Sequence, residues 1–188
     1  MKPDEYLAAF HAHVGRFFAG HSVRHETFTD GPILAFAPTF HVLVVEPGPR
    51  TSHWTYVSAG AALVEMKEPR RLEFCFIANR PSSRHVELLA MVTHYHATER
   101  LGVGHTLPIG EPWVRGSKLE HLLVSLPYPF GRDFELLPRS DGDVRVLWLL
   151  PISHAERDFK VREGWEALEA RFDEARIDYW DPYRRSEV

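Results

Sequence analysis

Residues able to do chemistry are most concentrated in the stretch HYHATERLGVGHTLPIGEPW, which contains His94, His96 and His105. Imidazoles can bind a metal ion or move a proton near neutral pH. On a helix, His94 and His96 would point about 200° apart, so they could not hold the same ion. A metal site would need His105 and a third ligand such as His85 or His121. We favour solvated or hydrogen-bonded histidines and predict no metal site.

Nucleophilic catalysis and cofactor binding lack their usual signatures. The chain has no Gly-x-Ser-x-Gly elbow, and Ser58 and Ser117 lie in small-residue segments that are typical of turns. A pair of His105 with a serine would need an orienting acid that the sequence does not place. Gly102 and Gly104 follow an expected helix, whereas phosphate binding needs glycines that open one. We predict no catalytic residue and no cofactor. The alternative hypothesis for the function is a small-molecule or metal-dependent enzyme with a pocket around Ser58, His105 and Ser117.

Large aromatic residues in proline-rich segments are the more distinctive feature. Trp113 follows a proline in EPW, and Tyr128 and Phe130 alternate with prolines in LPYPFG. Proline stiffens such segments and removes backbone donors. Rigid aromatic side chains are favoured anchors in binding surfaces. We therefore predict a partner-binding surface formed by Trp54, Trp113, Tyr128 and Phe130, although such rings can equally close the ends of a core.

Composition narrows the classes of function. The 188 residues include 22 basic and 26 acidic residues, for a formal charge of -4. This mild acidity argues against a general nucleic-acid binder, which needs basic patches to neutralise phosphates. No run approaches the ~20 apolar residues that span a bilayer, and the acidic start MKPDEY does not resemble a signal peptide. The single cysteine, Cys75, allows no internal disulfide. We expect a cytoplasmic protein that does not enter a membrane.

Periodicity and capping signals predict three helices and seven strands. Apolar residues recur at helical spacing near the start of the chain, and Ser153 and Glu156 match a capping box. β-branched and apolar runs between turn signals indicate strands. Helices are expected at residues 4–19, 82–100 and 153–175, with an interruption at Gly164, and strands at 41–46, 54–58, 61–65, 71–77, 105–109, 121–126 and 144–150. The segment before residue 41 is expected to be a loop. This order predicts an α+β fold: a single domain, residues 1–188, with a twisted mixed or mainly antiparallel sheet packed by helices.

The strand expected at residues 71–77 has one clearly apolar face. Leu72, Phe74 and Phe76 alternate with Glu73 and Cys75. Cys75 points to the opposite side from the apolar residues. No neighbouring residue would activate its thiol, so we interpret it as a small buried or half-buried hydrophobe.

The order of several motifs resembles the suppressor of fused family in its compact bacterial form. No single motif is specific, but the ordered set covers most of residues 40–182. The matching segments are FHVLVVEP (40–47), WTYVSAG (54–60), LEFCF (72–76), LGVGHTL (101–107), EPWVRGS (111–117), LLVSLPYPFG (122–131), VLWLLPI (146–152) and GWEALE (164–169).

The resemblance implies one α+β domain without enzymatic activity. Animal members of the family bind transcription factors through protein contacts and use a second, C-terminal domain, so that role is not transferred to this chain. Bacterial relatives are associated with polymorphic toxins. We therefore expect a non-enzymatic, cytoplasmic protein-binding domain, in its most specific form an immunity protein that neutralises a toxin domain. A regulator of a housekeeping protein would look the same in sequence, and the oligomeric state is not predicted.

Overall fold

The computed structural model describes residues 2–66 and 71–188, which divide into two units. The first unit comprises Met1–Leu101 and Leu126–Trp148, and the second comprises Gly102–Ser125 and Leu149–Val188. Strand β8 (Val144–Ser153) contributes its first half to one unit and its second half to the other. The assignment of residues 1–188 to one domain stays a prediction.

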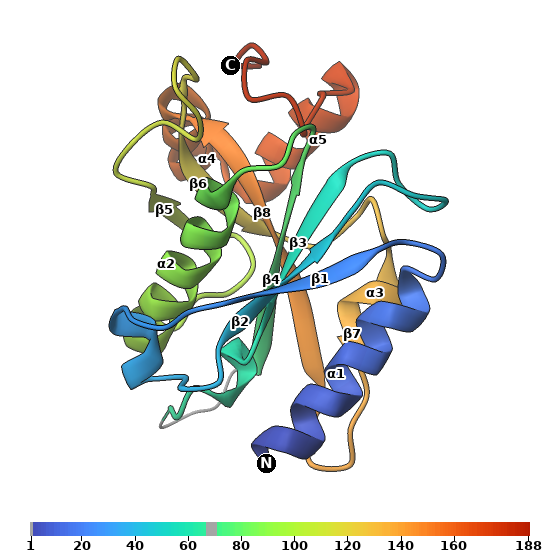
Figure 1. Ribbon diagram of the computed structural model, residues 1–188. Coiled ribbons are helices and arrows are strands. Elements are labelled where there is room, and N and C mark those ends of the chain that lie inside the picture. The colour runs from blue at the N-terminus through green and yellow to red at the C-terminus, as the bar shows by residue number, and fades with distance from the viewer. Residues whose placement is uncertain (1, 67–70) are drawn as a thin grey trace. The chain divides into compact units, whose positions relative to one another are not determined.

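The first unit is built on a mixed sheet in the strand order β1-β2-β3-β4-β8 (Figure 1). Neighbours from β1 to β4 are antiparallel, whereas β4 and β8 run parallel. The short strand β7 adds an antiparallel pairing with β8. The elements of this unit are α1 (Pro3–Phe17), β1 (Val23–Thr27), η1 (Pro32–Ala35), β2 (His41–Val45), β3 (Trp54–Ala59), η2 (Ala61–Leu63), β4 (Leu72–Ala78), α2 (Ser83–Glu99), α3 (Arg132–Glu135) and β7 (Leu136–Leu137).

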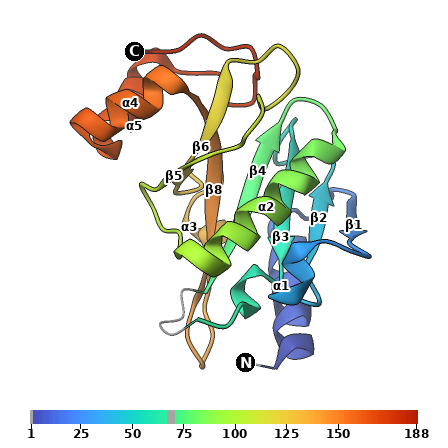
Figure 2. The same ribbon diagram turned by 90° about the vertical axis from the view of Figure 1, so that its left-hand side faces the viewer.

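Helices α1 and α2 cover opposite faces of this sheet (Figure 2). Phe74 of β4 packs against His96 of α2, with ring centroids 5.4 Å apart. On alternate positions of the same strand, Glu73 accepts a hydrogen bond from Tyr6 of α1. Both faces are therefore covered, and all seven residues of β4 are buried. Cys75 is fully buried, as interpreted from the sequence, and burial raises the pKa of its thiol well above the usual range.

Two local predictions in this unit are wrong. Residues 61–65, expected as a strand, contain the 3-10 helix η2 instead. Gly60 precedes it with φ at +110°, a left-handed conformation that glycine adopts without strain and that turns the chain out of β3. The expected loop before residue 41 contains β1, whose sequence VRHET is polar and largely exposed. Such an edge strand shows no apolar periodicity, so the sequence pattern did not reveal it.

The second unit combines β5 (Thr106–Pro108), β6 (Leu119–Ser125) and the end of β8 with helices α4 (His154–Glu163) and α5 (Trp165–Ala175). The predicted capping box at the start of α4 is present, with Ser153 and Glu156 each satisfying the other's backbone N–H. Gly164, at φ +97°, separates α4 from α5 at the predicted interruption. Leu168 and Phe172 form the buried side of α5.

The predicted class, an α+β fold with a mixed sheet packed by helices, is confirmed by these elements. Most predicted strands and helices occur within a few residues of their expected bounds. Over the described parts of the chain, no helix is both long and apolar enough to cross a membrane.

Candidate functional site

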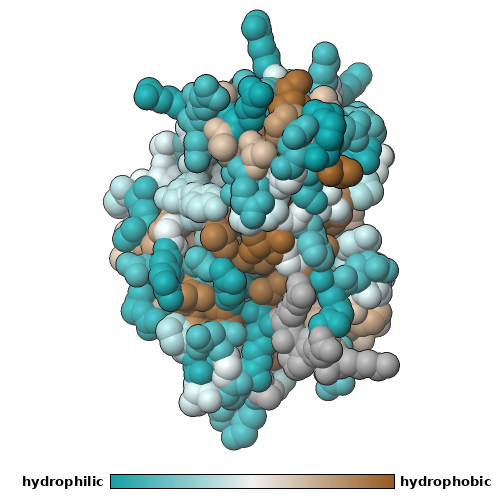
Figure 3. Space-filling view, turned by 180° about the vertical axis from the view of Figure 1, so that it is seen from behind, coloured by the Kyte–Doolittle hydropathy of each residue, from teal (hydrophilic) through white to brown (hydrophobic). Residues whose placement is uncertain are grey.

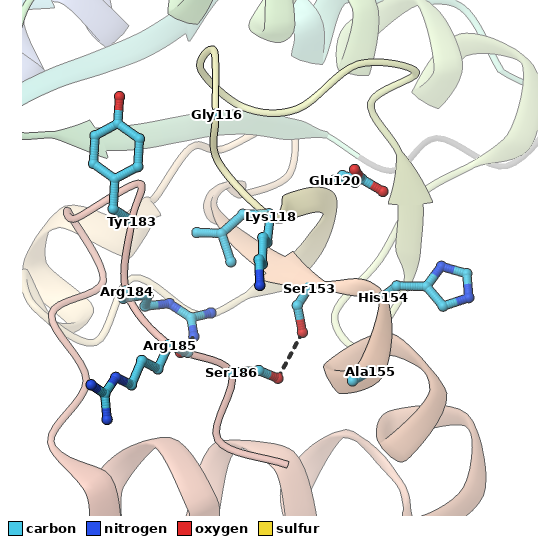
Figure 4. Close-up of a pocket in the computed structure, with 11 residues that line it drawn as sticks. Gly116, Lys118, Glu120, Ser153, His154, Ala155, Tyr183, Arg184, Arg185 and Ser186 are labelled. Carbon is cyan, nitrogen blue, oxygen red and sulfur yellow. Dashed lines mark hydrogen bonds between the residues drawn. The ribbon is translucent and has the colours of Figure 1, made fainter.

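A pocket of about 610 Å³ lies in the second unit, where the C-terminal tail passes the start of α4 (Figure 4). Its walls come from three segments that are distant in sequence. These are the loop that leads into β6, with Gly116 and Lys118, the start of α4, with Ser153 and His154, and the tail from Tyr183 to Ser186. The tail thus forms one wall of the pocket.

A buried ion pair holds the tail. The guanidinium of Arg184 donates to both carboxylate oxygens of Glu156, at 2.6 and 2.9 Å, and to the backbone carbonyl of Pro151 at 2.9 Å. The side chains of Arg184 and Glu156 are 4% and 0% exposed. Ser153 and Ser186 add a hydroxyl–hydroxyl hydrogen bond of 2.8 Å at the pocket floor. Because charge is expensive to bury unless paired, this contact fixes where the tail runs.

Two cations of the pocket remain available to a ligand. Lys118 and Arg185 are exposed, and neither forms an ion pair with a carboxylate of the described residues. Lys118 points toward the centre of the pocket in Figure 4. Arg184, in contrast, is neutralised by Glu156. Against the one exposed carboxylate of the lining, Glu120, these two cations leave an excess of positive charge, which can attract an anionic group such as a carboxylate.

Tyr183 adds an exposed aromatic ring at the rim. It is 64% exposed, yet its backbone N–H donates to Asp181 at 2.9 Å and its hydroxyl donates to the carbonyl of Arg115 at 3.3 Å. A ring held in this way loses little conformational freedom when it is covered. Tyrosine and arginine are enriched in protein-binding sites, so Tyr183 and Arg185 are the residues of this pocket that are typical of one.

The sequence alone does not assign these residues to a site. Arg184 and Arg185 stand out only as a pair of basic residues, and Glu156 as part of a capping box. Nothing in the local sequence indicates that the tail returns to the start of α4, because that contact joins residues 28 positions apart.

The four aromatic residues predicted to bind a partner have different environments. Tyr128 is 58% exposed, whereas Trp113 is only 1% exposed. Trp54 is half-buried at the start of β3. Phe130 is half-buried and packs edge-on against Phe18, with ring centroids 5.2 Å apart. Tyr128 is thus the one of the four that offers most of its ring to a partner. The surface itself stays a prediction.

The three residues of the predicted alternative pocket lie in both units. Ser58, in the first, is fully buried and donates a hydrogen bond to Glu73. His105 and Ser117 belong to the second. His105 is exposed. Ser117 is buried, and its hydroxyl donates to the carbonyl of Pro182 at 2.6 Å and accepts from the amide of Leu119 at 3.0 Å. The serine hydroxyls are therefore engaged in structural hydrogen bonds.

The histidines considered in the sequence analysis have structural contacts. His96 is buried and accepts a hydrogen bond from the amide of Leu101 at 3.0 Å. His85 is buried and stacks on Phe76, with ring centroids 5.0 Å apart. A group with the geometry of a metal site occurs elsewhere in the described part of the chain. It consists of His11, His25 and His41, which the sequence analysis did not bring together.

Glu73 is a further buried polar residue that the sequence did not reveal. Its carboxylate accepts hydrogen bonds from two hydroxyls and three backbone amides; the donors are Tyr6, Ser58, Gly60, Ala61 and Ala62. Burial raises the pKa of Glu73 to about 7. The hydrogen bonds favour the charged form and oppose this rise, but burial has the larger effect. Its contacts join α1, β3 and η2, which is a structural role.

Comparison with known proteins identifies the fold. The family model described as Suppressor of fused protein (SUFU) matches residues 37–185. No curated protein matches the chain in sequence. A solved SUFU homolog from Neisseria gonorrhoeae is 36% identical, with 98% of each chain covered and a TM-score of 0.87.

Two more distant structures share the fold. The Sufu–Fu complex crystal structure matches with a TM-score of 0.73 and 18% identity, covering 95% of this chain and 86% of that one. Drosophila Suppressor of Fused matches with a TM-score of 0.72 and 16% identity, covering all of this chain and 54% of that one. The family model and the homolog from Neisseria gonorrhoeae show that the chain belongs to the suppressor of fused (SUFU) family.

Proposed function

We propose that the chain is a protein-binding domain and that the pocket around Lys118, Tyr183 and Arg185 is its binding site. Membership of the SUFU family supports protein binding, since a structure of the same fold is that of Sufu in complex with Fu. Binding is not coupled to catalysis in this proposal. The proposed location is the cytoplasm.

The observation that carries the choice of site is the fixed, exposed ring of Tyr183 beside two cations without carboxylate partners. Tyrosine and arginine are enriched among the residues that dominate binding energy. A partner segment with an acidic side chain could place its carboxylate near Lys118 and Arg185 while it covers Tyr183. The charged contact would speed association, and burial of the ring would slow dissociation.

The surface in Figure 3 is more consistent with a partner that binds reversibly than with a subunit of a permanent complex. On the face shown in Figure 3, polar side chains predominate and surround a limited group of apolar side chains near the middle. Obligate interfaces are instead large and hydrophobic. We therefore propose a partner that is bound reversibly and recognised by specific side chains.

In its most specific form, the proposal is that the chain is an immunity protein that neutralises a toxin domain. The acidic side chains of α5 support this form: Glu166, Asp173 and Glu174 are exposed, against one exposed base, Arg171. Toxin domains that attack nucleic acid need a basic surface. An acidic helix would attract such a surface over a distance.

Affinity capture from a lysate of the native host tests this proposal. Tagged wild-type protein is compared with a double variant of the pocket, Tyr183→Ala with Lys118→Glu. The matched control is a double variant of exposed residues in the first unit, Tyr95→Ala with Arg132→Glu. We expect one protein that co-purifies stoichiometrically with the wild type and the control but not with the double variant. A toxin-like partner would support the immunity form. Equal capture by all three proteins would contradict the proposed site.

A further inference from the structure

Three histidines from three elements meet on the α1 side of the first unit. His11 lies on α1, His25 on β1 and His41 on β2. In the antiparallel register of β1 and β2, His25 pairs with Leu43, and Thr27 pairs with His41. His25 is thus two positions from the residue opposite His41, which places both imidazoles on one face of the strand pair. Helix α1 covers that face with His11.

The rings approach one another closely. The centroid of His11 is 4.8 Å from that of His25 and 4.9 Å from that of His41, and the rings of His25 and His41 stack at 5.4 Å. One ligand nitrogen from each residue lies within 4.8 Å of the other two, and Nε2 of His11 is 2.8 Å from Nε2 of His41. The 2.8 Å contact is a hydrogen bond between the two imidazoles. Ligands of one tetrahedral ion, with bonds of about 2.0–2.1 Å to histidine nitrogen, lie about 3.3 Å apart, so small movements of the rings would let an ion replace this hydrogen bond.

A backbone contact orients the most buried of the three. Nδ1 of His41 lies 2.9 Å from the carbonyl oxygen of Thr39, so that Nδ1 carries the proton and Nε2 keeps its lone pair. Histidines that bind metals usually donate their other ring nitrogen to a carbonyl or carboxylate in this way. The lone pair of His41 therefore points at His11 and accepts a hydrogen bond from its Nε2–H, and a bound ion would take the place of that proton.

We propose that His11, His25 and His41 form a binding site for a divalent transition-metal ion of the zinc and copper group. Three imidazole nitrogens without carboxylates match the preference of these ions, whereas magnesium and calcium select oxygen ligands. His41 is 8% exposed and His11 is half-buried, but His25 is exposed. The ion would enter past His25, with a fourth position left for water or a ligand from solvent.

An ion held by these three residues would join α1 to the β1–β2 pair, so its binding should stabilise this unit.

Titration of untagged protein with zinc chloride tests the site. Calorimetry should show one Zn²⁺ per chain. At a free Zn²⁺ concentration of 100 times Kd, the melting temperature should rise by roughly 5–10 °C. His25→Ala removes an exposed ligand, so the variant should fold, as circular dichroism would verify, but bind Zn²⁺ at least about tenfold more weakly and lose most of the thermal shift.

His154→Ala is the matched control. His154 lies in the second unit, 3.5 Å from Asp158 and near His121, where a surface ion could also bind. This variant should keep the wild-type affinity and thermal shift. The proposal is overturned if folded wild-type protein shows no saturable Zn²⁺ binding. It is overturned equally if His25→Ala binds as tightly as the wild type, or if His154→Ala is the variant that loses binding.

Discussion

At the scale of single residues, burial decides which polar and aromatic side chains stabilise the fold and which can meet a partner. Glu73 is buried, and hydrogen-bond donors from α1, β3 and η2 satisfy its carboxylate oxygens. Trp113 closes part of the core, while Tyr183 and Tyr128 extend into solvent. Residue type alone does not separate these cases, since each is a polar or aromatic residue that could serve either role.

Glu73 should make stability depend on pH. Its folded-state pKa of about 7 exceeds the ordinary value of 4.5, so between these values the folded state holds a proton that the unfolded state has released. Its contribution is therefore complete below pH 4.5 and falls by roughly 3 kcal/mol as the pH rises to 7. In urea unfolding, the difference in stability between wild type and Glu73→Gln should shrink across this range. A difference that stays constant would contradict the shift.

Trp113 and Tyr128 should respond differently to removal of the ring. Trp113→Ala should lower the free energy of unfolding by about 3–5 kcal/mol, because the side chain is 1% exposed and its loss leaves a cavity. Tyr128→Ala should change it by less than about 0.5 kcal/mol, since the ring is 58% exposed. Chemical denaturation of both variants checks this pair. Similar losses in the two would contradict the assigned burial.

At the scale of elements, the helices and strands marked by an apolar period, a β-branched run or a capping signal were predictable. Those without such a signal were not. The strand β2 and the helix α4 follow directly from a β-branched run and a capping box. The edge strand β1 is polar, and η2 depends on a left-handed glycine and on Glu73, which comes later in the chain. The pocket was not predictable, since it requires the tail to return to α4 through a long-range ion pair.

The tail and α4 should be coupled energetically through that ion pair. Arg184→Ala leaves the carboxylate of Glu156 buried without its charged partner and should cost about 3–5 kcal/mol. The double variant Glu156→Gln, Arg184→Met should recover part of this loss, because no uncompensated charge remains. Urea unfolding of the set measures the coupling. Additive losses in the double variant would indicate that the two side chains do not act as a pair.

At the scale of the whole molecule, the formal charge of -4 is mild, and the distribution of charge matters more than the sum. Carboxylates are exposed along α5, while Lys118 and Arg185 lie at the pocket of the same unit. In the proposed function, the carboxylates of α5 attract a partner toward this unit, and the pocket then binds it. The SUFU fold supplies the scaffold, and these side chains supply the proposed specificity.

Association with the captured partner should depend on the charge of α5. Glu166→Lys combined with Glu174→Lys should slow association about tenfold or more at low ionic strength, with less effect on dissociation, because exposed charges act mainly on encounter. Stopped-flow mixing at several salt concentrations measures both rates. If association becomes faster or is unchanged, the partner does not approach α5 with a basic surface.

The measurement that tests the central claim most directly is calorimetric titration of the captured partner into wild type, Tyr183→Ala, Tyr128→Ala and Tyr95→Ala. Binding through the pocket predicts that Tyr183→Ala raises Kd by roughly 30-fold or more, which corresponds to a loss of about 2 kcal/mol. Tyr95→Ala should match the wild type. If Tyr183→Ala binds as tightly as the wild type while Tyr128→Ala weakens binding, the partner uses the surface first predicted from the sequence, and the pocket is not the binding site.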